Sequence, residues 1–218
     1  MNKGREMLFR FKTTLPPLCK CSVIAGMKES SEPNLAPPGS GLPKLELMAA
    51  RVIFGWRLRT GTRAAFNEVF RRERRNVLEL AGGLDENSGA KRVLIKRIRG
   101  VEDSSRYWSV FMTLDHLQIV QSQVAMVICQ LLKGVIPQGK ASTAKVKPRP
   151  GATIASVKEF DASCDQLLAA VAEPSNLQTE ATYEHPWFGE LNAEGWHALA
   201  ALHLGIHRRQ IEQILKGL

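Results

Sequence analysis

Two histidines near the C-terminal end of the chain are spaced to bind a single metal ion. His203 and His207 are four residues apart in a segment with helical periodicity, so their side chains leave the same side of a helix with Cβ atoms about 5–6 Å apart. Sites for a divalent metal usually need a third protein ligand and keep one position open for water or substrate. The first chemical question is therefore which other residue joins this pair.

His116 is the best candidate for the third ligand. It lies in the middle of an apolar face of another predicted helix, in a chain with five histidines. Three buried neutral imidazoles are unusual unless something satisfies their ring nitrogens. A metal ion does so and prefers the neutral ring. The alternative is that each of the three is an ordinary core histidine held by a hydrogen bond.

Two more residues are candidates for contacts with a substrate or with the ligands. His185 precedes a proline in a predicted loop that could fold over the mouth of the site, because the residue before proline avoids the helical region. Gln123 lies two helical turns beyond His116 on the same face. We therefore include His185 and Gln123 as outer members of the predicted site.

Two neighbours of the predicted ligands are expected outside the site. His197 lies about 120° from His203 around the helix axis, which favours a solvent-facing position or one at the edge of the site. Asp115 is about 100° from His116 around its helix, which argues against a role as a fourth ligand. Neither is included among the predicted site residues.

Helical periodicity predicts the elements that position these residues. Apolar side chains recur at helical spacing in four long segments, and few segments look like strands. The pattern predicts an all-α protein, an antiparallel four-helix bundle in which metal sites form between facing helices. Ser105 or Ser109 could cap the second helix, and Asn192 the last. The predicted helices cover about residues 44–80, with a break near 60–62, then 104–132, 153–172 and 193–216, and residues 183–189 are predicted to be a loop.

The first 41 residues differ in composition from the rest. They are basic at first and then rich in proline, serine and glycine. Such a segment cannot bury enough apolar surface to offset the entropy lost on ordering. We therefore predict a disordered tail at residues 1–41 and one helical domain at residues 42–218. If the tail has no structural role, deleting residues 1–40 leaves the melting temperature unchanged.

Composition narrows the class of protein further. The chain has 218 residues, of which 44% are hydrophobic, and no stretch approaches the roughly 18–20 apolar residues that a membrane span needs. Four cysteines in a chain of this length do not suggest a disulfide framework, so we predict a cytoplasmic protein without a membrane partner. The net charge of +9 is spread along the chain and is not interleaved with stacking aromatic residues, which favours a solvated basic surface over a nucleic-acid-binding one.

Two segments resemble a known family. Residues 108–117, in which a Trp-Ser pair precedes an apolar run ending in His-Leu, resemble the start of the second helix in DinB/YfiT-like proteins. Residues 185–191, HPWFGEL, are similar to a loop that in one DinB-like subfamily leads into a helix with an HxxxH motif and then Gln-Ile. Here that helix carries His203, His207 and Gln210. The order and spacing of these motifs together make the resemblance fairly specific.

The resemblance implies a four-helix bundle with a divalent metal bound by His116, His203 and His207. Characterised members of the family include metal-dependent thiol S-transferases and hydrolase-like enzymes. We accordingly predict a metal-dependent transferase or hydrolase that acts on a small molecule, such as a low-molecular-weight thiol, with zinc or nickel as the metal. The motif holds no carboxylate to act as a general base, which is compatible with thiol transfer. The alternatives are a non-enzymatic stress-induced bundle and a basic nucleic-acid-binding protein, and a homodimer is also open.

Overall fold

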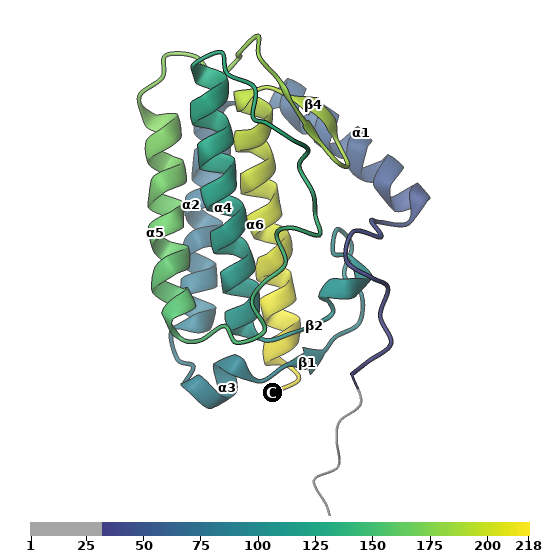
Figure 1. The fold of residues 1–218 in the computed structure, drawn as a ribbon. Coiled ribbons are helices and arrows are strands. Elements are labelled where there is room, and N and C mark those ends of the chain that lie inside the picture. The colour runs from purple at the N-terminus through teal and green to yellow at the C-terminus, as the bar shows by residue number, and fades with distance from the viewer. Residues whose placement is uncertain (1–31) are drawn as a thin grey trace, which may run out of the picture. The chain divides into compact units, whose positions relative to one another are not determined.

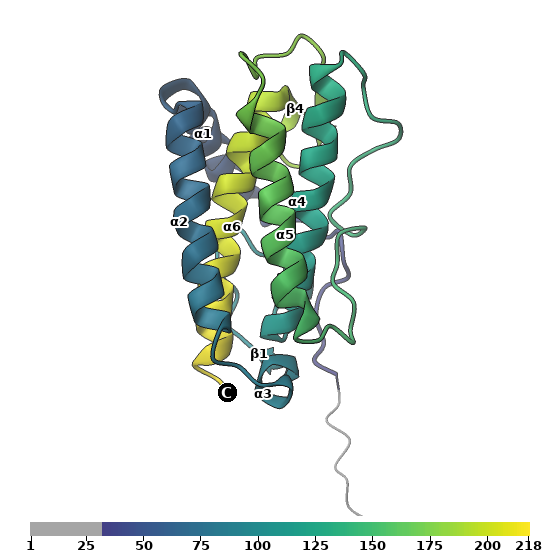
Figure 2. The ribbon, with the colours of Figure 1, turned by 90° about the vertical axis from the view of Figure 1, so that its left-hand side faces the viewer.

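Four long helices pack side by side around an apolar core (Figures 1 and 2). The computed structural model describes residues 32–218, of which residues 33–218 form one unit. None of the helices in this described part is long and apolar enough to cross a membrane. The predicted all-α four-helix bundle is confirmed, and its helices are α2 (Arg63–Ala81), α4 (Val110–Leu132), α5 (Ala155–Ala172) and α6 (Ala193–Leu215).

A long connection, residues 133–154, sets the direction of the helices. It returns from the end of α4 along the outside of the bundle to the opposite end, where α5 begins (Figure 1), so α4 and α5 run parallel. α6 contacts α4 and runs antiparallel to it, and α2 and α5 make a second antiparallel contact. Crossover connections of this kind occur in other four-helix bundles. We call residues 133–154 the strap.

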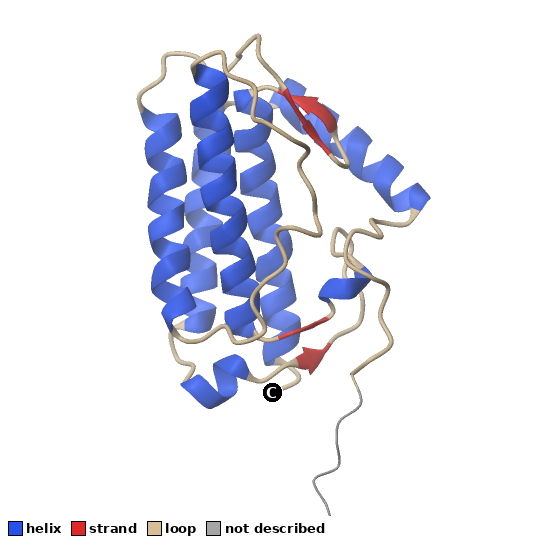
Figure 3. Cartoon of the chain, viewed as in Figure 1, coloured by secondary structure: helices blue, strands red, loops and turns tan. Residues whose placement is uncertain are grey.

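The first predicted helical segment divides into two helices at the expected break. α1 (Lys44–Thr60) is followed by its C-cap residue Gly61, and the Thr62 hydroxyl caps α2 by accepting a backbone N–H at 3.2 Å. α1 lies outside the four-helix bundle (Figure 3), and its buried Phe54 ring packs 4.6 Å from the ring of Phe188. Of the predicted segment, only α2 therefore contributes a helix to the bundle.

α4 begins later than predicted. The Ser109 hydroxyl caps it by accepting a hydrogen bond from the N–H of Met112 at 3.0 Å, which confirms one of the two proposed caps. The residues just before the cap cannot be helical, because β2 (Tyr107–Trp108) pairs antiparallel with β1 (Val93–Leu94). The remaining short elements of this region are α3 (Glu86–Ala90) and a 3-10 turn, η1 (Asp103–Ser105).

Removal of the Ser109 hydroxyl should lower the free energy of unfolding by about 1 kcal/mol, the usual cost of losing a capping side chain. Ser109 is buried, so water cannot replace the lost hydrogen bond. For a chain of this size we expect the melting temperature of Ser109→Ala to fall by about 2–4 °C. Thermal unfolding followed by circular dichroism measures the change, with Ser109→Thr as a control that keeps the hydroxyl. Equal melting temperatures for wild type and Ser109→Ala would contradict the assigned cap.

The segment predicted as a loop before the last helix is a short β-hairpin. β3 (Tyr183–His185) and β4 (Gly189–Leu191) pair antiparallel, and Gly189 has a positive φ of 73°, which glycine adopts without strain. The loop prediction was wrong for these residues because strands of three residues are too short to show alternation. The predicted cap of α6 is confirmed, since the side chain of Asn192 accepts an N–H at 2.9 Å.

Residues 33–41 are hydrogen bonded to the domain, although they were predicted to belong to the disordered tail. The buried carboxylate of Glu102 accepts hydrogen bonds from the backbone N–H groups of Gly39 at 3.2 Å and Gly41 at 3.3 Å. The prediction was wrong here because the acceptor lies far away in the sequence. Residues 1–31 of the predicted tail lie outside the described residues. Deleting residues 1–40 would remove one of these bonds, so an unchanged melting temperature is no longer the expected result.

Candidate metal centre

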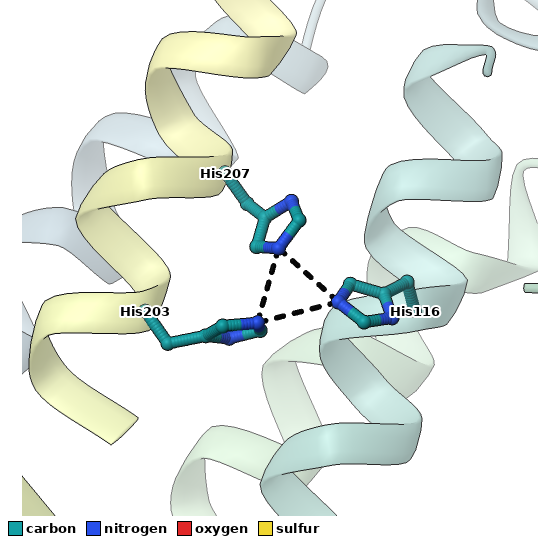
Figure 4. A group of neighbouring side chains, drawn as sticks. All are labelled: His116, His203 and His207. Carbon is teal, nitrogen blue, oxygen red and sulfur yellow. Dashed lines mark hydrogen bonds between the residues drawn. The ribbon is translucent and has the colours of Figure 1, made fainter. Parts of the chain in front are cut away.

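The three predicted histidines meet between α4 and α6 (Figure 4). His116 comes from the first half of α4, and His203 and His207 come from successive turns of α6. The Nε2 atom of His207 lies 3.1 Å from that of His116 and 3.0 Å from that of His203, and the remaining pair is 3.3 Å apart. The structure thus brings together all three residues that the sequence analysis selected.

Hydrogen bonds on the outer side of two rings leave a lone pair on each Nε2 atom. Nδ1 of His116 lies 2.6 Å from the backbone carbonyl oxygen of Val146 in the strap, which can only accept a hydrogen bond. Nδ1 of His207 lies 2.6 Å from Oε1 of Gln210, whose amide nitrogen donates to the carbonyl of Ser105 at 2.8 Å. Because a neutral imidazole carries one N–H, a proton on Nδ1 leaves Nε2 free to bind a cation. Outer partners of this kind orient most histidine ligands of metals.

Burial keeps the three rings neutral. His116 and His207 are buried, and His203 is partly exposed. Burial lowers the pKa of His116 to about 4, although the hydrogen bond to Val146 acts in the opposite direction. Burial, followed by the neighbouring histidines, lowers the pKa values of His203 and His207 well below 6.5. The neutral imidazole is the form that binds metal ions, so these residues do not have to release a proton to bind a metal at neutral pH.

The donor set fits a divalent transition metal. Two nitrogen ligands at about 2.0–2.1 Å from one ion lie about 2.9–3.4 Å apart in octahedral or tetrahedral geometry. The observed separations between Nε2 atoms, 3.0 to 3.3 Å, fall within this range. Nδ1 of His203 is buried and has no hydrogen-bond partner among residues 32–218. Of the three rings, that of His203 is therefore the one whose tautomer is not fixed by the described residues. Imidazole suits several first-row metals, and the set does not select one.

An aromatic residue and a partly buried ion pair lie next to the histidines. The ring of Trp108 lies 5.1 Å from that of His116 and stacks on that of His207 at 6.2 Å. The ammonium group of Lys147 lies 5.5 Å from the Trp108 ring and donates to Glu102 at 2.7 Å. The positive charge of Lys147 lowers the pKa of both His116 and His207 further. The strap therefore contributes a positive charge, that of Lys147, next to Trp108 and the rings of His116 and His207.

The two predicted outer residues differ in their relation to the histidines. The ring of His185, in β3, lies 5.4 Å from that of Trp196, and its charge would lower the pKa of His203. Gln123 is exposed and lies about 10 Å farther along α4 than His116. Within the described part of the chain, no hydrogen bond joins Gln123 to the three histidines. The structure thus places His185 near the group and does not bring Gln123 to it.

His197 faces another helix and not the solvent. It is fully buried, and its Nε2 atom lies 3.0 Å from Oδ1 of Asn67 on α2. The expected solvent-facing position was wrong, because α6 contacts both α2 and α4 and most of its circumference is therefore covered. Both carboxylate oxygens of Asp115 accept hydrogen bonds from Arg149. Asp115 therefore contacts the strap and does not face the three histidines as a fourth ligand would.

The residues that hold the histidine rings from outside were not predicted from the sequence. Gln210 follows His207 by three residues, and this helical spacing could have identified it. Val146 and Ser105 act through backbone carbonyls, which have no signature in the sequence. The strap, which carries Val146, also lacks any periodicity that would place it beside α4.

Comparison with known proteins adds a family match. The model of the DinB superfamily matches residues 69–211, a range that includes all three histidines. Among solved structures, the chain is similar to TT2238, described as a four-helix bundle protein, at 22% sequence identity and a TM-score of 0.49. That match covers 69% of this chain and 98% of TT2238. None of the curated proteins matches the chain.

Proposed function

The chain belongs to the DinB superfamily, and from this premise we propose that it is a metal-dependent enzyme that uses His116, His203 and His207 as ligands. The observation that supports the proposal most is the convergence of three Nε2 atoms within 3.3 Å of one another. Three protein ligands leave a coordination position for a substrate, as in other catalytic sites. Zinc and nickel are the metals we expect, because both accept imidazole ligands.

Neutral ligands determine what chemistry such a site can support. A divalent ion held by three uncharged imidazoles would keep its positive charge and would stabilise an anionic nucleophile of the substrate. The protein's own part is orientation, since Val146 fixes the ring of His116 and Gln210 fixes that of His207. Trp108 covers the same two rings with an apolar surface.

We favour transfer of a thiol over hydrolysis. The two carboxylates whose charges act on His116 are Asp115 and Glu102, and both are engaged elsewhere. Asp115 accepts hydrogen bonds from Arg149, and Glu102 from Lys147. Both nucleophiles must lose a proton, but a free thiol has a pKa of about 8.5 and gives its proton to solvent far more readily than water does. Thiol transfer therefore depends less on a protein base than hydrolysis does. His185 is our candidate for a contact with the substrate.

A paired assay tests this choice. Protein loaded with zinc or nickel is given a panel of small thiols, namely cysteine, glutathione and coenzyme A, with monobromobimane, whose bromide the thiol sulfur displaces. In parallel the same protein is given p-nitrophenyl esters. We expect metal-dependent thiol transfer that is lost in His207→Ala. Ester hydrolysis alone would support the hydrolase, and no metal-dependent turnover of either substrate would support the non-enzymatic bundle.

A further inference from the structure

Two adjacent residues of α4 fix the strap to the bundle. The carboxylate of Asp115 accepts hydrogen bonds from the backbone N–H of Arg149 at 2.7 Å and from its Nε at 2.9 Å. The next residue, His116, contacts the carbonyl of Val146 at 2.6 Å. One turn of α4 therefore holds the strap at two points that are only three residues apart.

The buried carboxylate of Asp115 requires the contact with Arg149. The side chain of Asp115 is 0% exposed, whereas that of Arg149 is 63% exposed. A buried carboxylate is costly without partners, and Arg149 supplies three donors, since its Nη2 also contacts Asp115. The position of the Arg149 backbone is thus set by the requirement of a buried charge. The outer edge of the same guanidinium reaches Glu159 at 2.9 Å near the surface.

The rest of the strap depends on side-chain anchors of this kind. It contains no helix or strand, and Pro148 and Pro150, on either side of Arg149, have no N–H to donate. Directly after Val146, Lys147 donates to Glu102 at 2.7 Å and to Ser104 at 2.9 Å. Before Val146, the hydroxyl of Thr143 donates to the same carboxylate at 2.9 Å. The carbonyl of Val146 is therefore held in place from both directions.

We infer that the ion pair of Asp115 and Arg149 positions His116 for metal binding. By fixing the strap, it presents the Val146 carbonyl to Nδ1 of His116. That carbonyl keeps the proton on Nδ1 and directs the Nε2 lone pair toward the other two histidines. Asp115 and Arg149 are positioning residues and not ligands. The inference rests on the proposed function for its metal, but its effect on the His116 ring exists in the metal-free protein.

The tautomer of His116 is the first readout. In metal-free protein labelled with nitrogen-15 at histidine, NMR distinguishes a ring protonated on Nδ1 from one protonated on Nε2, and loss of signals in His116→Asn assigns the residue. We expect His116 to be protonated on Nδ1 in the wild type and to show a mixture of tautomers in Arg149→Gln. The matched control is Glu159→Gln, which removes the other partner of the guanidinium and should leave the tautomer unchanged. An unchanged tautomer in Arg149→Gln would overturn the inference.

Metal affinity is the second readout. Competition with a chelating dye gives the Kd for zinc, and we expect Arg149→Gln to bind about 10–100-fold more weakly, the usual effect of losing an outer partner of a ligand. Arg149→Lys keeps the charge but not the fork of donors, so it should recover part of the affinity. Equal affinities of Arg149→Gln and Glu159→Gln would contradict a positioning role. If the wild type binds neither zinc nor nickel, the proposed function fails, and the tautomer measurement still decides whether the ion pair orients His116.

Discussion

Replacement of His203 by alanine should abolish binding of one equivalent of zinc or nickel and leave the bundle folded. The variant keeps two of three ligands, so the loss of affinity should exceed the about 10–100-fold typical of losing an outer partner. The fold should survive because His203 is partly exposed and its Nδ1 atom has no hydrogen-bond partner among the described residues. Isothermal titration with each metal, and circular dichroism of the same samples, measure the two effects.

His197→Gln is the matched control for this experiment. It removes a histidine from the same helix, but one that contacts Asn67 and not the other histidines. Glutamine can still donate a hydrogen bond to the Asn67 oxygen. We expect this variant to bind metal as the wild type does. One equivalent of metal retained by His203→Ala would refute the ligand assignment, and a loss in both variants would point to general destabilisation.

Acid should destabilise the metal-free protein well above the pH at which most carboxylates protonate, and His197 should contribute part of the effect. Burial, followed by the charge of Arg63, lowers the pKa of His197 to about 4, against about 6.5 in the unfolded chain. The unfolded state therefore takes up the proton first. The stability that neutral His197 contributes is complete above about pH 6.5 and is lost as the pH falls toward 4. A difference of this size corresponds to about 2–3 kcal/mol between pH 7.5 and 4.5.

Urea unfolding at several pH values measures this dependence. The free energy of unfolding of the wild type should fall more steeply between pH 6.5 and about 4.5 than that of His197→Gln, which has no group to protonate at this position. Near pH 7.5 the free energies of unfolding of the two proteins should change with pH at nearly the same rate. Parallel curves for the two proteins over this interval would contradict a buried, neutral His197.

The histidine group was predictable because its signals are local. The spacing of His203 and His207 places them on one side of a helix wherever that helix packs, and the apolar face around His116 turns it toward the core. The capping residues Ser109 and Asn192 were predictable for the same reason, since a cap depends on a few neighbouring residues.

The rest of the site could not be predicted because it depends on contacts between distant segments. The strap has no periodic pattern, so nothing in its sequence reveals that Val146 would meet His116 or that Arg149 would meet Asp115. The pairing of the buried Asp115 with Arg149 cannot be seen from the sequence of α4 alone. The position of α1 outside the bundle was missed for a related reason, because its apolar residues resemble those of a core helix.

The metal content of protein purified without an affinity tag or chelator tests the central claim most directly. Elemental mass spectrometry is applied to the wild type and to His116→Ala, and thermal unfolding is repeated with added zinc or nickel, since a ligand that binds the native state raises its stability. We predict close to one equivalent of a transition metal, or a rise in melting temperature on adding it, in the wild type alone. No metal in the wild type and no stabilisation by either ion would contradict the proposed metal centre.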